Sequence, residues 1–221
     1  ANNAQGAGSP EIVYALAPYA APGGQTRLYA AGAISSAAGI SAHGIASWDG
    51  TAWAGLGLGL WLNSIESLWV RAYALAVYDD GGGSRLYVGG NFATANGAAA
   101  GRMARWDGQT LTPLPAYGLG TGTVRALATF DDGGGLALYI GGSFAAAGGI
   151  LVSGVARFDG AWSDVGAGVA SDSGAPLAAV RTLSRCPSGA TTALFAGGDF
   201  ARAGGTETVN AAIWNGVTWA A

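Results

Sequence analysis

The chain has 221 residues, of which 40 are glycine and 48 are alanine, and its ten basic residues are all arginine. The glycines follow no strict G-x-y period and prolines number only 7, which excludes collagen, and an apolar content of 50% is too high for a disordered chain. A net charge of −3 without a basic run argues against nucleic acid as a partner, and no apolar run approaches the roughly 20 residues of a membrane span.

Catalytic and metal-binding residue types are scarce. Cys186 is the only cysteine, so the chain has no internal disulfide and no cysteine metal cluster. His43 is the only histidine, which leaves little for zinc or triad chemistry. The sequence therefore shows no catalytic constellation, and we expect no cofactor and no enzymatic activity.

The first part of the chain predicts four short strands. An Ala-Leu-Ala segment at 15–17 is followed by Leu-Tyr-Ala-Ala-Gly at 28–32, by Ile-Ala-Ser-Trp-Asp-Gly at 45–50 and by Trp53. Apolar and small residues alternate through these segments, as packed strands require. The Asp-Gly pair predicts a tight hairpin between strands three and four, because such pairs accept positive φ.

The next segment, 61–69, breaks this order. Trp61, Ile65, Leu68 and Trp69 recur at helical spacing, and Asn63 and Glu66 have the spacing of a helix capping box. The aromatic stripe either lies in the core, which is the commoner fate, or forms a surface that meets a partner protein.

The second and third parts of the chain repeat the first. Leu-Tyr-x-Gly-Gly recurs at 86–90 and 138–142, and Ala-Arg-aromatic-Asp-Gly recurs at 104–108 and 156–160. Trp162 marks strand four of the third copy, and Leu111 lies near that place in the second. We expect the Gly-Gly pairs to let the chain leave strand two without steric cost.

Paired aspartates join strands one and two in these copies. Asp79 and Asp80 precede three glycines, and so do Asp131 and Asp132. Two carboxylates and nearby carbonyls offer oxygen ligands of the kind calcium takes, but no full D-x-D-x-D-G ladder is present. We favour a turn signature and keep calcium as the alternative.

The fourth copy has Leu-Phe-Ala-Gly-Gly at 194–198 and Ala-Ile-Trp-Asn-Gly at 212–216, followed by Trp219. Asn215 stands where the other copies have aspartate, which keeps the turn and loses the charge. The aspartate at this position is therefore interpreted as structural.

Four tandem units of four strands predict an all-β fold, a β-propeller of four-stranded antiparallel blades. We expect one domain over 1–221, with repeats at about 11–60, 61–120, 121–170 and 171–221. These four units could close a four-bladed ring by themselves. Propellers with more blades are common, so we favour the alternative that the chain is a section of a longer array or part of a multi-chain ring.

The motif order resembles kelch-like propeller repeats, in which a strand ending in Gly-Gly is followed by an aromatic-Asp pair and a Trp. The fuller pattern is more similar to the repeat of the fungal cortical polarity-marker proteins and to repeats of uncharacterised bacterial exported proteins. This resemblance covers nearly the whole chain. It implies a propeller in a secreted, extracellular or cell-surface protein, and it does not identify a ligand.

One position varies between copies in a way that suggests binding. The residue before the Ala-Leu-Ala segment or its counterpart begins the inner strand, near the expected channel mouth; in order it is Tyr14, Tyr73, Arg125 and Arg181. Arginine offers a bidentate fork and tyrosine a stacking face with a hydroxyl, so this set predicts an anion or sugar site. The alternative is that these residues cap the strand and pair with loop carbonyls.

The favoured function is a non-catalytic, exported propeller scaffold that contacts protein or glycan through the loops between strands two and three. Its partner is another protein or a second copy of itself in a larger assembly. The rival function is a carbohydrate-binding or carbohydrate-active propeller that uses the channel mouth.

Overall fold

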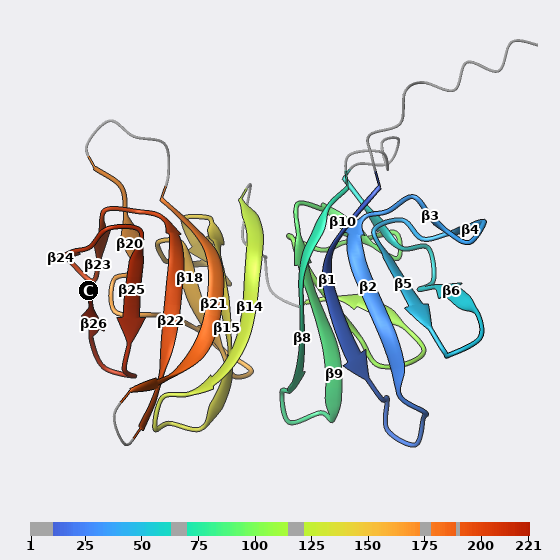
Figure 1. Cartoon of the computed structure of the whole chain (residues 1–221), viewed down its shortest axis with the longest axis horizontal. Coiled ribbons are helices and arrows are strands. Elements are labelled where there is room, and N and C mark those ends of the chain that lie inside the picture. The colour runs from blue at the N-terminus through green and yellow to red at the C-terminus, as the bar shows by residue number, and fades with distance from the viewer. Residues whose placement is uncertain (1–10, 63–69, 115–121, 173–177, 189–190) are drawn as a thin grey trace, which may run out of the picture.

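Figure 1 shows the computed structural model of the chain, which describes residues 11–62, 70–114, 122–172, 178–188 and 191–221. Regular structure in these ranges consists of β-strands, and the predicted all-β class is confirmed. The same ranges contain no helix with the length and apolar character needed to cross a membrane. The helix predicted around 63–69 lies outside the described residues.

Four antiparallel sheets of four strands follow one another along the chain (Figure 1). The first sheet has the order β1 (Ile12–Tyr19), β2 (Arg27–Ala33), β5 (Ile45–Trp48), β6 (Trp53–Gly55). The second has the order β8 (Ala72–Asp79), β9 (Ser84–Gly90), β12 (Met103–Trp106), β13 (Leu111–Pro113). The third has the order β14 (Thr123–Asp131), β15 (Leu136–Ser143), β18 (Val155–Phe158), β19 (Trp162–Asp164). The fourth has the order β21 (Ala179–Ser188), β22 (Thr191–Asp199), β25 (Ala211–Trp214), β26 (Trp219–Ala220).

The connections between strands two and three, which the sequence predicts as small-residue loops, contain short hairpins. These are β3 (Ser36–Ala37) with β4 (Ile40–Ser41), β10 (Thr94–Ala95) with β11 (Ala98–Ala99), β16 (Ala146–Ala147) with β17 (Ile150–Leu151), and β23 (Arg202–Ala203) with β24 (Thr206–Glu207). Two further strands come from the connections between sheets. They are β7 (Leu60–Trp61), which pairs with β10, and β20 (Val169–Ala170), which pairs with β23.

The predicted turn between strands three and four is confirmed. Asp49 Oδ1 accepts hydrogen bonds of 2.8 Å from the backbone amides of Thr51 and Ala52. Asn215 Oδ1 accepts two bonds of the same length from Val217 and Thr218. The carbonyl oxygen common to both side chains thus makes the turn, and the glycine that follows has a positive φ, 104° at Gly50.

The Gly-Gly pairs leave room for a neighbouring backbone, which is a different structural role from the one that the sequence suggests. They lie at the end of strand two, where Gly90 is the last residue of β9 and Gly142 and Gly198 each precede the last residue of their strand, and their φ angles are not positive. A Cβ on the second glycine would collide with a backbone carbonyl oxygen at the start of strand one, for example Thr123 O beside Gly142. Close approach of two backbones therefore requires glycine here.

Neighbouring sheets pack through their faces. Strand β1 lies against β8, β8 against β14, and β14 against β21, so the four first strands line one side of the molecule (Figure 1). Each pair of neighbouring sheets shares one hydrophobic core, giving three such cores. Within the described residues, β1 and β21 make no comparable contact, so the array is open.

The recurring aromatic residues pack within sheets as well as between them. Trp48 lies opposite Trp53 with ring centroids 5.5 Å apart, and Trp214 lies opposite Trp219 at 5.3 Å. Between sheets, Trp106 Nε1 donates to the Tyr29 hydroxyl at 3.1 Å. The recurring aromatic residues therefore stabilise individual sheets as well as the contact between neighbouring sheets.

Candidate functional site

The four residues proposed from the sequence as a ligand site share one structural feature. The pairing of strands one and two skips a residue between Val13 and Ala15, and the same skip occurs in every sheet. The skipped residues are Tyr14, Tyr73, Arg125 and Arg181. A β-bulge frees a residue from the ladder and redirects its side chain. We call these four residues the bulge row.

Three members of the bulge row contact one another. The rings of Tyr14 and Tyr73 have centroids 4.9 Å apart, and the Arg125 guanidinium carbon lies 5.2 Å from the centroid of Tyr73. This is cation–π distance, so the Arg125 charge rests on a tyrosine face. Arg125 Nε is buried without a hydrogen-bond partner among the described residues. The tyrosines and Arg125 thus form a continuous surface across three sheets.

The fourth member is held by a carboxylate of its own sheet. Arg181 Nε donates to Asp199 Oδ2 at 2.7 Å, and Nη2 lies 2.5 Å from the same oxygen. The hydrogen bond from Arg181 and the positive charges of Arg181 and Arg125 lower the pKa of Asp199, so its carboxylate stays ionised. Arg125 therefore acts on the same carboxylate that fixes Arg181.

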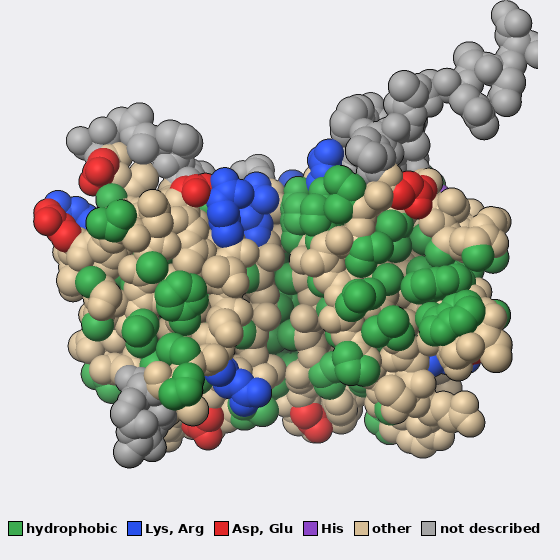
Figure 2. Space-filling view, in the orientation of Figure 1, with side chains coloured by type: hydrophobic (Ala, Val, Ile, Leu, Met, Phe, Trp, Pro, Cys, Tyr) green, Lys and Arg blue, Asp and Glu red, His purple; other side chains and the backbone are tan. Residues whose placement is uncertain are grey.

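A pocket of about 720 Å³ adjoins this end of the row. Its polar lining combines the two arginines with hydroxyl, amide and carboxylate groups: Arg125, Ser143, Ser171, Asp172, Arg181, Asp199 and Asn210. Phe200, which is buried in the core, lies in the wall of the pocket. Figure 2 shows basic side chains gathered beside hydrophobic ones along the upper edge of this side of the molecule. Such a lining can bind a polar ligand through hydrogen bonds and stacking.

The paired aspartates proposed as an alternative calcium site are bound by protein donors. Asp79 Oδ1 accepts from the backbone amides of Gly81 and Gly83, at 2.9 and 3.0 Å. Asp131 does the same in the third sheet with Gly133 and Gly135. The first aspartate of each pair therefore closes the turn, as favoured from the sequence.

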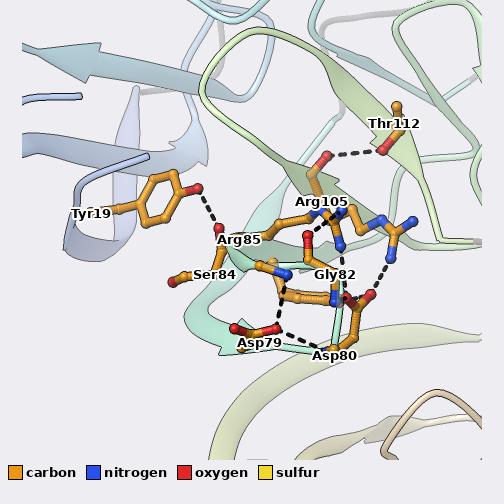
Figure 3. A network of polar contacts seen from close by, with 11 residues as sticks. Tyr19, Asp79, Asp80, Gly82, Ser84, Arg85, Arg105 and Thr112 are labelled. Carbon is orange, nitrogen blue, oxygen red and sulfur yellow. Dashed lines mark hydrogen bonds and ion pairs between the residues drawn. The ribbon is translucent and has the colours of Figure 1, made fainter. Parts of the chain in front are cut away.

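The second aspartate of each pair is the centre of an ion-pair network (Figure 3). Asp80 contacts Arg85 at 2.6 Å, Arg105 on strand three, and the Tyr87 hydroxyl at 2.8 Å. Burial raises the pKa of Asp80, but the Tyr87 hydroxyl, the Gly82 amide and the two arginines outweigh it, and the net shift is downward.

The third sheet repeats this network. The Tyr139 hydroxyl donates to Asp132 Oδ2 at 2.8 Å, and Arg157 Nε lies 2.8 Å from the same oxygen. The arginines put positive charge where a cation would sit. Over the described ranges, no group of three or more His, Cys, Asp or Glu side chains is placed to hold a metal ion.

The aromatic segment proposed as an interface is described only in part. Trp61 stacks on His43 with ring centroids 4.5 Å apart, and its Nε1 donates to Leu58 O at 2.7 Å. Ile65, Leu68 and Trp69 lie outside the described residues. Trp61 is half-buried in β7, which pairs with β10 of the hairpin between the second and third strands of the second sheet.

No family model, no curated protein and no solved structure matches this chain in the comparisons made.

Proposed function

We propose that the chain is a non-catalytic binding scaffold made of β-propeller blades, and that the bulge row with its adjoining pocket binds glycan. The observation that carries this proposal is the placement of the four bulge residues. Four bulges turn two tyrosines and two arginines out of their ladders at the same end of neighbouring strands.

The chemistry of the surface fits a sugar. Tyr14, which is 39% exposed, offers a ring face for stacking on the apolar side of a pyranose. The ion pair of Arg181 with Asp199 supplies donors and an acceptor for vicinal hydroxyls. Positive and negative groups are balanced in the pocket, with Arg125 and Arg181 against Asp172 and Asp199, which favours a neutral or weakly acidic glycan.

The propeller architecture, like the extracellular or cell-surface location, is part of this proposal. It is supported by the four repeated sheets, each with the same strand order and the same bulge. Protein contact through the hairpins between strands two and three also stays a prediction. The exposed Leu151 on β17 favours it, since that residue is 87% exposed.

The test is a glycan array read with the wild-type chain and single-site variants. We expect Arg125→Ala and Arg181→Ala each to lower the affinity for the bound glycans by about tenfold or more. A loss of this size is expected when one charged hydrogen-bond partner is removed. Arg27→Ala removes the same charge at the opposite end of the strands and is the matched control. Circular dichroism confirms that each variant is folded. Glycan binding that survives both changes, or the absence of any bound glycan, would contradict the proposal.

A further inference from the structure

The contacts between neighbouring sheets follow one pattern. In the second sheet Gly89 lies against Val124 and Leu127 of the third, and in the third Gly141 lies against Val180 and Leu183 of the fourth. A Cβ on Gly141 would come within 2.6 Å of Val180 Cγ1, so only glycine leaves room for the valine. The third and fourth sheets therefore each insert a valine and a leucine from strand one into a glycine hollow on the preceding sheet.

The first sheet presents these inserting residues with nothing to receive them. Val13 is 51% exposed, whereas its counterparts Val124 and Val180 are completely buried. Leu28 is 37% exposed, whereas its counterparts Leu86, Leu138 and Leu194 are completely buried. With Leu16, which is 60% exposed, Val13 and Leu28 form what we call the leading face. Figure 2 shows hydrophobic side chains gathered over this sheet.

The fourth sheet presents the corresponding position without a neighbouring sheet packed on it. Gly197 holds the place of Gly89 and Gly141, but it is buried, and the atoms nearest to a Cβ there belong to Thr182 and Phe195 of its own sheet rather than to an inserted valine. Phe195 holds the place of Tyr87 and Tyr139, which are completely buried, yet it remains half-buried. We call the surface of Gly197 and Phe195 the trailing face.

We propose that the leading face of one chain docks on the trailing face of a second copy, and that two copies close a ring of eight sheets. The argument is continuity with the packing between neighbouring sheets, which occurs three times in the chain and twice with a valine set against a glycine, because the two open faces are the two halves of that contact. A contact between unlike faces either closes a ring or continues as a filament. Two copies bury both open faces of each, and eight four-stranded sheets lie within the range of known propellers.

The trailing face carries polar groups that suit it to contact with water before a second copy binds. Thr182 and Ser184 stand where the other sheets have alanine, and both are exposed. They keep the small volume that the incoming leucine needs, and their hydroxyls lower the cost of leaving the face in water before assembly. The proposed contact does not involve the bulge row as a ligand site, so it stands independently of glycan binding.

The test is the solution mass of residues 1–221, measured by native mass spectrometry and by light scattering across a range of concentrations. We expect twice the chain mass of 21.7 kDa. Leu16→Asp should weaken the dimer by at least about thirtyfold, as expected for a central apolar contact. Leu58→Asp, at another exposed leucine outside both faces, should leave the dimer unchanged.

A second variant addresses the other face. Gly197→Arg fills the hollow and should weaken the dimer as strongly as Leu16→Asp, with melting temperature confirming that the chain folds. If Leu16→Asp dissociates the dimer while Gly197→Arg does not, two leading faces meet and the proposal is wrong. A monomer at all concentrations, as expected if a different protein or a further stretch of chain covers these faces, overturns it. A ladder of masses overturns the two-copy ring.

Discussion

At the scale of single residues, aspartates at the turns determine the local geometry. The amides of Ala52 and Thr51, the Thr51 hydroxyl and the charge of Arg27 lower the pKa of Asp49 to about 2. The pKa values of Asp80, Asp107, Asp132 and Asp159 are also lowered on folding. These side chains are acceptors in the folded chain, and their ionised form is the one that the fold stabilises.

These shifts predict acid sensitivity. A carboxyl whose pKa is lower in the folded chain than its ordinary value of 3.8 stabilises the fold fully at neutral pH. That contribution is lost as pH falls from about 4 towards the folded pKa, near 2 for Asp49. We expect the melting temperature to fall between pH 5 and pH 2, measured by circular dichroism.

The control for acid sensitivity is supplied by the chain itself. Asp49→Asn should keep the turn at neutral pH, because Asn215 makes the same two amide contacts in the fourth sheet. This variant should also lose less stability in acid than the wild type. A melting temperature that is constant or rises on acidification would contradict the assignment.

Removing Asp80 is expected to lower the free energy of unfolding at neutral pH by more than removing an exposed ion pair does. Asp80→Ala leaves Arg85, Arg105 and the Tyr87 hydroxyl without their shared acceptor. We expect a loss of about 1–3 kcal/mol in the free energy of unfolding, measured in urea. Glu207→Ala, which breaks the exposed pair with Arg202, should cost less than about 1 kcal/mol. Equal losses in the two variants would show that the network is not structural.

At the scale of elements, the packing between neighbouring sheets repeats along the chain, just as the strands within each sheet do. The glycine hollow and the inserted valine vary together. Gly89 faces Val124 and Gly141 faces Val180, whereas in the first pair of sheets Ala31 and Ala72 share one core. An alanine in the hollow is compatible with an alanine opposite, because the summed volume stays near constant.

This pairing predicts a coupling between two positions. Gly89→Ala should cost about 1–3 kcal/mol by overpacking against Val124, and Val124→Ala about 2 kcal/mol through a cavity. The double variant should cost clearly less than the sum, since it recreates the alanine pair of the first interface. The control combines Gly89→Ala with Val180→Ala, which lies in another interface and should be additive. Additivity in both double variants would contradict the hollow-and-insert description.

The sequence predicts the elements well because their cues are local. Alternation of apolar residues, Asp-Gly pairs and the recurring Leu-Tyr string identify all four strands of every sheet. The bulge at the start of strand one has no local cue, since it is a mismatch in pairing between two strands. For the same reason the sequence could place Tyr14 and Arg125 at equivalent positions but could not show that they lie beside Tyr73.

At the scale of the whole molecule, four sheets form an open array whose two end faces we propose to be complementary. The leading face carries Val13, Leu16 and Leu28, and the trailing face carries Gly197 and Phe195. Open sheet arrays with exposed apolar faces are prone to association, and ring closure removes that exposure. The repeat number alone favours a longer array or a multi-chain ring, and the exposed fractions identify the faces that we propose to meet.

The most direct test of this account is an experimental structure of the assembled particle, by crystallography or electron microscopy. The account predicts a closed ring of eight sheets from two chains, with Val13 and Leu16 of each chain against Gly197 of the other. A four-sheet ring closed within one chain, or a dimer joined through any other pair of surfaces, would contradict it.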